Sequence, residues 1–462
     1  MRAWPWKACS DEPGPMSALR APVAPDERPR RGRPPARNEI LRAGRLGGVD
    51  PEELAARYGT PFYAYDLDVI TRQVEALRSI LPAGFELAYA VKANPSLGVV
   101  AHLAGLGLGA DVASGGELAT ALRAGIHAGR IVMTGPGKCD VELPAAVTAG
   151  IRAVTVESPG ELRRLERIAA SQGRRVPILL RGAVSAEAAL ERVRLVGDDG
   201  AGKFGMDAAD LVASAEHAVA SPNLELLGLH LFGSSNVLDA AALADHVERT
   251  MTAARQLARA AGLRLRLVDV GGGLGIPYEP TDEALDLAGL GRRLADIAAR
   301  AADDAVLCGA TVLFEPGRFI VGPAGAYVAR VVDRKCVGGR DVVILDGGIH
   351  HVLRPALVGQ EHRVRRLGGD REAVGRFAPV TVAGPLCSGL DVLATEVMLA
   401  APEPGDLVAV LDAGAYGFTE SMPYFLSHPI PAEVAVRGGR HALLRPRVEP
   451  ETWLATQLAP MW

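Results

Sequence analysis

The chain has 462 residues, of which 48% are hydrophobic and 23% are charged, and its formal net charge is -4 at pH 7. This length and composition predict a globular protein with a large core, divided into two domains. The negative net charge gives no electrostatic basis for binding nucleic acid, and no apolar run approaches the roughly 18–20 residues that span a membrane.

The five cysteines are scattered along the chain and do not have the spacing of metal ligands. They are Cys9, Cys139, Cys308, Cys336 and Cys387. An odd number of cysteines, in a sequence without a secretory signal, is typical of reduced thiols. We therefore expect a cytoplasmic protein.

The first 40 residues hold clusters of arginine and proline, such as Arg28-Pro29-Arg30-Arg31, and few apolar residues. Such a segment cannot bury enough apolar surface to fold, so residues 1–40 are predicted to form a disordered tail. Order is predicted to begin near Asp50-Pro51-Glu52-Glu53, which has the residue types of a helix N-terminus. We expect residues 41–62 to pack with the second domain.

From residue 63 onwards, short apolar runs alternate with amphipathic segments. Helices are predicted, for example, over 67–81, 116–124 and 239–260. Strands are predicted over 87–91, 110–113, 131–134, 153–156, 177–180, 226–232, 263–268 and 312–314. This alternation is typical of a parallel sheet covered on both faces, and it predicts a (β/α)8 barrel over 63–322. The run over 62–65 adds one strand more than a closed barrel needs, so either one end unit lies outside the barrel or one run is not a strand.

The alternation of apolar runs and amphipathic segments ends at about residue 322. Short apolar runs follow one another without long helices between them, at 327–332, 342–345, 380–382, 407–411 and 432–436. We expect a β-rich domain over 323–462, so the fold class is α/β, with a barrel followed by a β-rich domain.

Four motifs lie at the carboxyl ends of predicted strands, where barrel enzymes carry their active sites. They are Lys92 in Ala88–Pro95, His230-Leu231-Phe232-Gly233-Ser234-Ser235, Asp269-Val270-Gly271-Gly272-Gly273, and Phe314-Glu315-Pro316-Gly317-Arg318. Glycine runs let backbone N–H groups approach a phosphate. Each motif also has an ordinary explanation, as a surface lysine, a tight turn or a surface ion pair. Together they favour a site for a phosphate-bearing cofactor.

With these motifs the chain resembles, over residues 45–440, the fold-type III pyridoxal-phosphate decarboxylases, the ornithine, arginine and diaminopimelate decarboxylase family with an alanine racemase-like fold. The resemblance implies that Lys92 forms a Schiff base with pyridoxal 5'-phosphate and that Glu315 faces the pyridine nitrogen. It also implies a homodimer with shared active sites, in which Cys387 enters the site of the partner subunit. The groups implied to hold the phosphate are Ser235, Gly271, Gly272, Gly273, Gly317, Arg318 and Tyr416.

The chemistry of decarboxylation agrees with these implied roles. An anionic Glu315 favours a protonated pyridine nitrogen, which lets the cofactor withdraw the electrons left behind by CO2. A racemase of the same fold is expected to carry an arginine there. Lys92 is implied to shuttle protons, and Cys387 to reprotonate Cα, although a cysteine can also be an inert buried residue.

The sequence does not decide which side chain stacks on the ring of the cofactor. The family commonly uses a histidine two residues after a first histidine and three before the phosphate-binding serine. Phe232 stands at that position, with His230 matching the first histidine. Phenylalanine can stack as well, and a shift of one residue would let His230 reach the ring instead.

Two departures from the diaminopimelate decarboxylase pattern concern the distal end of the substrate. Ser388 stands where a glutamate would hold the distal amine, and Val358 stands where a tyrosine would help Arg354 and Arg318 to hold the distal carboxylate. Losing a buried partner costs much discrimination, so meso-diaminopimelate fits poorly. Ornithine and lysine fit poorly too, unless Asp391 supplies an anion.

Further stretches, among them Asp346-Gly347-Gly348-Ile349-His350-His351, resemble the exosortase-associated decarboxylases and those that act on an amino acid tethered to a carrier protein. The sequence thus predicts α-decarboxylation of an L-amino acid, acidic or carrier-tethered, in natural-product biosynthesis. The alternatives are a diaminopimelate decarboxylase of lysine biosynthesis, a racemase, which Glu315 disfavours, and a catalytically inactive regulatory paralogue. We expect no metal, because His350 and His351 have no evident third ligand.

Overall fold

The structure is a computed structural model, and it describes residues 40–184, 202–279, 281–367 and 377–460. The predicted disordered tail lies outside these residues, apart from Ile40. None of the helices in the described ranges is long and apolar enough to cross a membrane.

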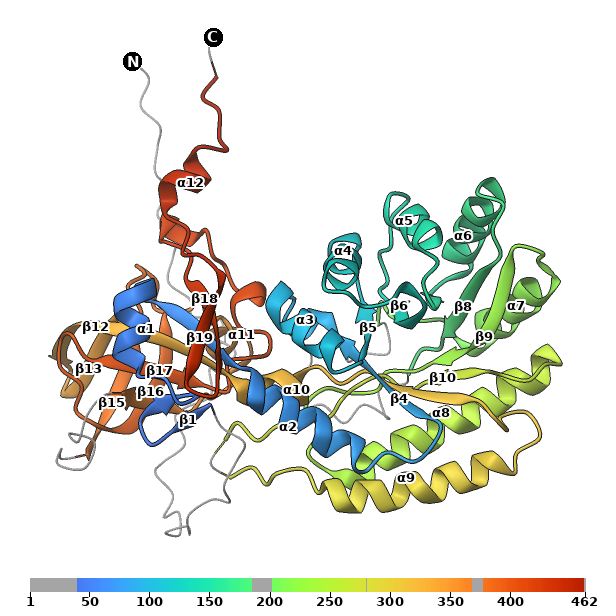
Figure 1. The fold of residues 1–462 in the computed structure, drawn as a ribbon, viewed down its shortest axis with the longest axis horizontal. Helices are drawn as coiled ribbons and strands as arrows, with labels where there is room; N and C mark the ends of the chain where they lie inside the picture. Colours follow the sequence, from blue (N-terminus) through green and yellow to red (C-terminus); the bar gives the residue numbers. More distant parts are fainter. Residues whose placement is uncertain (1–39, 185–201, 280, 368–376, 461–462) are drawn as a thin grey trace, which may run out of the picture. The chain divides into compact units, whose positions relative to one another are not determined.

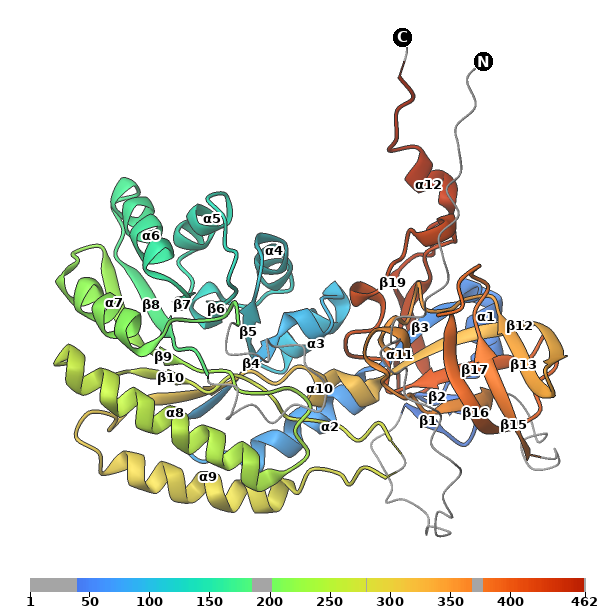
Figure 2. The same ribbon diagram turned by 180° about the vertical axis from the view of Figure 1, so that it is seen from behind.

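Eight parallel strands form a closed barrel, in the order β10-β11-β4-β5-β6-β7-β8-β9. The strands are β4 (Phe85–Ala90), β5 (Gly109–Val112), β6 (Ile131–Met133), β7 (Ala153–Val156), β8 (Val176–Arg181), β9 (Leu224–His230), β10 (Leu267–Asp269) and β11 (Thr311–Phe314). Figure 1 and Figure 2 show the helices on the outside of these strands. The predicted barrel is therefore confirmed.

Most of the helices around the barrel begin at a residue whose side chain caps them. Ser158 accepts a hydrogen bond from the N–H of Glu161 at the start of α6, and Asp239 accepts two at the start of α8. These helices are α2 (Leu67–Arg78), α3 (Leu97–Gly105), α4 (Gly115–Arg123), α5 (Glu142–Ala149), α6 (Pro159–Ser171), α7 (Ala208–Ala220), α8 (Ala240–Ala261) and α9 (Leu287–Ala302).

The interior of the barrel is filled with side chains. One separate buried cluster takes its members from six different barrel strands: Ala88, Val132, Ala153, Leu179, Leu267 and Leu313. Residues from so many strands of a closed barrel meet only inside it. The barrel is thus a packed core, and its chemistry must lie at the strand ends.

The second domain is built on a nine-stranded sheet. Its main path runs β16-β15-β13-β12-β3-β18-β19, and β17 pairs with both β12 and β14. The strands are β3 (Phe62–Asp66), β12 (Gly325–Val337), β13 (Arg340–Leu345), β14 (Val364–Leu367), β15 (Phe377–Ala383), β16 (Val392–Ala400), β17 (Leu407–Leu411), β18 (Ala432–Arg437) and β19 (Arg440–Arg445). This confirms the predicted β-rich domain.

The strand β3 explains the surplus in the predicted strand count. It pairs antiparallel with β12 and parallel with β18, so it belongs to the second sheet although it precedes the barrel in sequence. The first barrel strand is β4, which corrects the expected start of the barrel at residue 63. All five residues of β3 are buried, as in a barrel strand. Its two edges pair with β12 and β18, Tyr63 and Tyr65 belong to the main buried cluster, and Phe62 and Ala64 belong to a second one.

The segment before β3 packs on the same sheet. Ile40, Leu46, Val49 and Leu54 share a buried cluster with residues of β3, β12, β17 and β18. The segment contains β1 (Leu41–Arg42), β2 (Arg45–Leu46) and α1 (Pro51–Tyr58), and Asp50 caps α1 by accepting the N–H of Glu52.

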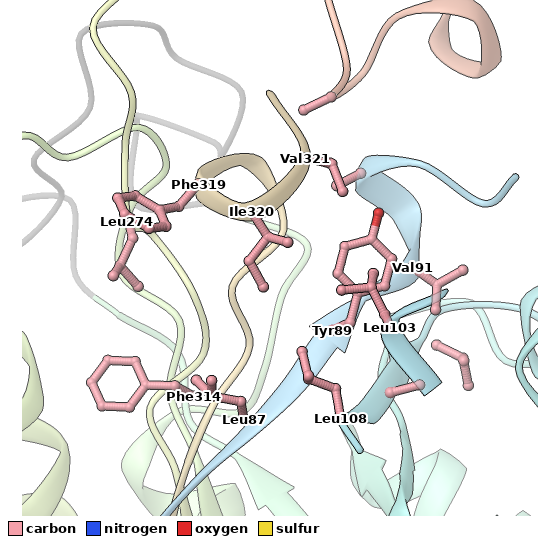
Figure 3. Close-up of a cluster of buried hydrophobic side chains, with 14 of the residues drawn as sticks. Leu87, Tyr89, Val91, Leu103, Leu108, Leu274, Phe314, Phe319, Ile320 and Val321 are labelled. Atoms are coloured by element: carbon pink, nitrogen blue, oxygen red, sulfur yellow. The ribbon is translucent and has the colours of Figure 1, made fainter. Parts of the chain in front are cut away.

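Short helical turns lie between or after these larger elements, and some of them carry residues of interest. They are η1 (Val91–Ala93), η2 (Ala128–Arg130), α10 (Arg318–Val321), η4 (Gly322–Ala324), α11 (Arg354–Val358), η6 (Phe418–Glu420), η7 (Phe425–Ser427) and α12 (Pro450–Leu454). Figure 3 shows Val321 of α10 near Tyr89 and Val91, and Phe319 beside Leu274. This apolar packing fixes α10 beside the end of β4.

Candidate active site

Lys92 lies where β4 ends and the turn η1 begins. Its neighbours Val91 and Ala93 are buried, whereas the Lys92 side chain is 45% exposed at the mouth of the barrel. The Nζ atom lies 3.7 Å from Oδ2 of Asp111, at the end of the adjacent strand β5. The sequence analysis did not assign a role to Asp111.

The electrostatic surroundings hold the Lys92 amine as a cation. Burial acts to lower its pKa, but the carboxylates of Asp111 and Glu315 and the hydroxyl of Tyr416 outweigh burial, and the pKa of Lys92 is raised. The amine is therefore paired and oriented in the protein without cofactor.

One cavity brings the four predicted motifs together. Its walls come from the ends of β4, β9, β10 and β11 and from the second domain: Ala90, Lys92, Phe232, Ser235, Gly272, Gly273, Leu274, Glu315, Gly317, Arg318 and Tyr416. Parallel strands of a barrel end at the same rim, which is why motifs far apart in sequence meet here.

Tyr416 reaches this cavity from the second domain because two hydrogen bonds join its loop to η1. The N–H of Tyr416 donates to the carbonyl of Ala93 at 2.8 Å, and the Asn94 side chain donates to the carbonyl of Gly414 at 3.0 Å. Tyr416 has a φ of 52°, which is unusual for a residue with a side chain. This strain indicates that its position is fixed by the surrounding structure.

Glu315 is buried beside Asp269, and a carboxylate oxygen of each lies within 4.8 Å of the other. Burial raises the pKa of Glu315, and the charges of Asp111 and Asp269 raise it further. Burial likewise raises the pKa of Asp269 to about 7. Among the described residues, none accepts or donates a hydrogen bond at Oε1 of Glu315.

The glycine loop after β10 is shaped by close packing. Gly271 and Gly273 have φ values of 65° and 95°, which glycine adopts without strain. A side chain on Gly272 would collide with the carbonyl of Glu315. In the described ranges, no residue accepts a hydrogen bond from the N–H groups of Gly272 and Gly273. These N–H groups are available to an anion.

Arg318 adds the positive charge that such an anion needs. One of its terminal nitrogens lies 3.5 Å from the hydroxyl of Ser235, the other donates to the hydroxyl of Tyr278 at 3.0 Å, and its guanidinium lies 4.7 Å from the centre of the Tyr416 ring. Ser235, Arg318 and Tyr416, three of the residues implied to hold the phosphate, are therefore neighbours.

Of the two candidate stacking residues, the geometry favours Phe232. Its ring lines the cavity, and its centre lies 5.6 Å from Nζ of Lys92. His230 is fully buried at the end of β9, with Nε2 3.7 Å from Oε2 of Glu315. Burial lowers the pKa of His230 well below its usual value, and the cations Arg181 and Lys92 lower it further, so the imidazole is neutral.

The residues fit pyridoxal phosphate. The cavity offers a lysine amine, a buried carboxyl group with an unpartnered oxygen, and a rim of N–H, guanidinium and hydroxyl donors for a phosphate. The donor atoms of His230, Asp269 and Glu315 also lie within 4.8 Å of one another, as in some metal sites. The lysine and the phosphate-type rim beside them point to the organic cofactor.

A second, open cleft of about 410 Å³ continues from this cavity, with which it shares Ser235 and Arg318. It is also lined by Arg354, Val358 and Gln360. Arg354 and Val358 are thus at the place where the sequence predicts the distal end of the substrate.

Cys387 and Ser388 lie in the loop between β15 and β16, and Cys387 is exposed. Asp391 closes this loop: its two carboxylate oxygens accept the N–H groups of Ile349 and Leu386, each at 2.8 Å. The expected role of Asp391 in binding a distal amine is therefore corrected, because the carboxylate is buried and already bonded. The other residues of the loop keep their proposed roles.

The rings of His350 and His351 pack with their centres 3.8 Å apart and their planes tilted by 44°. His351 bonds to Tyr327 and to the carbonyl of Pro429. Both rings are buried, as expected of structural residues.

Four residues of the site were not assigned from sequence. Asp269 stood in a quoted motif without a role, and Asp111 could have been noticed as an acid at the end of an apolar strand. Gln360 and Glu420, which both bond to Arg354, lie in loops without a recognisable pattern.

Comparisons with known proteins agree with this geometry. Residues 67–322 match the family model described as pyridoxal-dependent decarboxylase, pyridoxal binding domain. The chain is 33% identical over 426 residues to an L-glutamyl-[BtrI acyl-carrier protein] decarboxylase of Niallia circulans, covering 89% of this chain and 97% of the relative. It is 35% identical over 402 residues to a diaminopimelate decarboxylase of Aquifex aeolicus, covering 87% and 92%.

A solved structure is similar over the same range. Diaminopimelate decarboxylase from Helicobacter pylori, crystallised with L-lysine, has a TM-score of 0.78 and 30% sequence identity, and the match covers 88% of this chain and 98% of that one. With the family model matching more than half of the chain, the protein belongs to the pyridoxal-dependent decarboxylases and is a PLP-dependent carboxy-lyase.

Proposed function

We propose that this enzyme removes the α-carboxylate of an acidic L-amino acid whose distal carboxylate is bound to a carrier protein as a thioester. The observation that supports this most directly is the open cleft beside the cofactor cavity, where Val358 stands in place of the expected tyrosine. An open cleft accommodates the long arm of a carrier protein. The relative from Niallia circulans is named for a substrate of this kind.

The chain's own residues have distinct tasks in this reaction. Pyridoxal phosphate, when bound, takes up the electron pair left by departing CO2. Lys92 would hold the cofactor covalently and move protons at Nζ, with Asp111 orienting its amine. Glu315, as an anion, would lie beside the ring nitrogen and favour its protonated form. Phe232 contributes an apolar wall that excludes water.

The cofactor's phosphate would be held by the rim formed by Ser235, the glycine loop, Arg318 and Tyr416. Their N–H, hydroxyl and guanidinium groups all donate hydrogen bonds, which suits a dianion. Binding the phosphate orients the reacting end of the cofactor without taking part in bond breaking.

The second candidate is a meso-diaminopimelate decarboxylase of lysine biosynthesis. It is favoured by the retained Arg354 in the cleft and by the diaminopimelate decarboxylases among the relatives. It is disfavoured by Ser388 and Val358, which stand where a glutamate and a tyrosine are expected to hold the substrate's distal end.

Release of CO2 by the cofactor-loaded protein distinguishes the two candidates. We expect turnover of L-glutamate loaded on an acyl carrier protein and no turnover of meso-diaminopimelate by the same yellow, folded preparation. Free L-glutamate mixed with unloaded carrier protein is the control. Efficient turnover of meso-diaminopimelate would contradict the proposal and favour lysine biosynthesis.

We also propose a homodimer in the cytoplasm, with Cys387 of each subunit completing the other's active site. The loop closed by the two hydrogen bonds of Asp391 leaves Cys387 exposed, which supports this arrangement. Cys387 would then reprotonate Cα after CO2 has left.

Mixing two inactive variants tests the shared site. Cys387→Ala should still release CO2 but give little clean amine, and Lys92→Ala should give none. If each site combines Lys92 of one subunit with Cys387 of the other, half of the randomly mixed dimers contain one intact site. Amine formation should then recover to about a quarter of the wild-type rate. No recovery after proven subunit exchange would contradict the shared site.

A further inference from the structure

The substrate cleft contains Arg354, and the hydrogen-bond partners of this side chain bear on substrate choice. It lies at the start of α11, and its side chain is 4% exposed. Its Nη1 donates to Oε2 of Glu420 at 2.7 Å, and its Nε donates to Oε1 of Gln360 at 2.9 Å. Two acceptors of the chain itself therefore already bind this guanidinium.

The side-chain amide of Gln360 is oriented to accept from arginines. The Nδ1 atom of His362 lies 2.8 Å from the carbonyl oxygen of Leu411, so Nδ1 carries the proton and Nε2 is an acceptor. Nε2 lies 2.9 Å from the amide nitrogen of Gln360, which donates to it. The amide oxygen then faces Arg354 and also accepts from Arg318 at 3.4 Å.

Glu420 is held beside Arg354 by its own segment. The hydroxyl of the next residue, Ser421, donates to the carbonyl of Gly417 at 2.7 Å and accepts the N–H of Leu353 at 3.0 Å. The turn η6 is thereby fastened to the start of α11. The pair between Glu420 and Arg354 is a charge-assisted hydrogen bond in a largely buried place, where such pairs are strong.

A distal carboxylate on the substrate would interact unfavourably with the ion pair of Arg354 and Glu420. To bind Arg354 it must either displace Glu420, leaving that carboxylate without its partner, or lie beside a charge of the same sign. Both cost binding free energy. A distal thioester or amide carries no charge and avoids both costs.

We propose that Glu420 is a specificity-determining residue that makes the cleft select amino acids with a neutral distal group over those with a free distal carboxylate. The inference rests on the proposed function, since it concerns the distal end of the same substrate. Glu420 takes the place at Arg354 that the substrate's own carboxylate would otherwise occupy.

Two substrates that differ in distal charge provide the test: L-glutamate and its N-ethyl γ-amide, a stable compound that resembles the tethered form. The measurement is kcat/KM for CO2 release by cofactor-loaded wild type, Glu420→Gln and Glu361→Gln. Glu361 is exposed at the rim of the same cleft, so its variant removes an equal charge without touching Arg354.

We expect wild type to favour the amide, and Glu420→Gln to shift the ratio of the two kcat/KM values towards glutamate by about tenfold or more, because Arg354 becomes available. Glu361→Gln should leave the ratio near that of wild type. In the double variant Arg354→Gln with Glu420→Gln, the shift towards glutamate should be lost. A ratio cancels general damage to the enzyme, since both substrates use the same catalytic groups.

A binding measurement complements the rates: glutarate, which carries two carboxylates and no amine, should bind Glu420→Gln at least several-fold more tightly than wild type. If wild type decarboxylates the amide but Glu420→Gln leaves both the ratio and glutarate binding unchanged, this inference is overturned while the proposed function stands. If wild type prefers meso-diaminopimelate, with its free distal carboxylate, both are overturned. Glu420→Asp should shift the ratio less than Glu420→Gln and serves where the glutamine variant does not fold.

Discussion

Lys92→Ala should fold normally and release no measurable CO2 from any amino acid. Lys92 is the lysine of the cofactor cavity, and Asp111 holds its amine in place at 3.7 Å. Without it the cofactor has no covalent attachment and the reaction has no proton carrier at that position. A loss of roughly 10⁴-fold or more in kcat is on the scale of removing a covalent nucleophile.

The measurement is CO2 release together with borohydride reduction and mass spectrometry of the trapped cofactor. Wild type should carry the cofactor's mass on the peptide containing Lys92, and the variant should carry none. Lys335→Ala is the matched control, because Lys335 is exposed on β12 and should behave as wild type. Wild-type turnover by Lys92→Ala would refute the assignment of the catalytic lysine.

Glu315→Gln should retain the cofactor but lose about 10²–10³ in kcat, or roughly 3–4 kcal/mol of transition-state stabilisation, on the scale of removing a preorganised electrostatic partner. Burial raises the pKa of Glu315, so a charge on this carboxylate needs a cationic partner to stabilise it. A protonated ring nitrogen beside Glu315 would supply that partner and form an ion pair. Glutamine carries no charge and would leave the protonated ring without its anion.

The pH dependence of the bound cofactor's absorbance reports this change apart from the rate. We expect the spectrum of Glu315→Gln to titrate at lower pH than that of wild type, because the protonated ring has lost its anion. Glu86→Gln, at the opposite end of β4 and paired with Arg152, is the control and should leave the spectrum unchanged. If kcat of Glu315→Gln stayed near that of wild type, electron withdrawal through a protonated ring would be wrong.

The barrel and the gathering of its motifs could be predicted because both follow from local patterns. Each strand is a short apolar run, most barrel helices have a side-chain cap, and parallel strands must end at one rim. Lys92, Glu315 and the glycine loop were therefore expected to meet before any contact was known. Tyr416 joined them only through the family resemblance, since its loop, after β17, lies in the other domain.

The position of β3 could not be predicted from its composition. A fully buried strand has the same apolar run whether its neighbours are barrel strands or strands of another sheet. The surplus in the strand count was the one sign, and it did not identify which strand lay outside. Pairing with β12 and β18 depends on contacts across the whole chain.

The hydrogen-bond partners of side chains could not be predicted from the sequence for a different reason. Asp391 could bind a substrate amine or close its own loop, and only the positions of Ile349 and Leu386 decide between them. Glu420 and Gln360 reach Arg354 from separate loops, where no periodicity marks them. Loop geometry, and with it substrate choice, depends on such individual contacts.

The central place of β3 has a consequence for the order in which the protein can fold. During synthesis β3 emerges before the barrel, but both of its partner strands, β12 and β18, emerge only after it. The barrel's local pairings can form early, because consecutive strands are neighbours there. The second sheet must wait for the carboxyl-terminal strands, with the apolar β3 unpaired until then. We therefore expect the nascent chain to expose an aggregation-prone strand for most of its synthesis, and to depend on chaperones at that stage more than the finished fold would suggest.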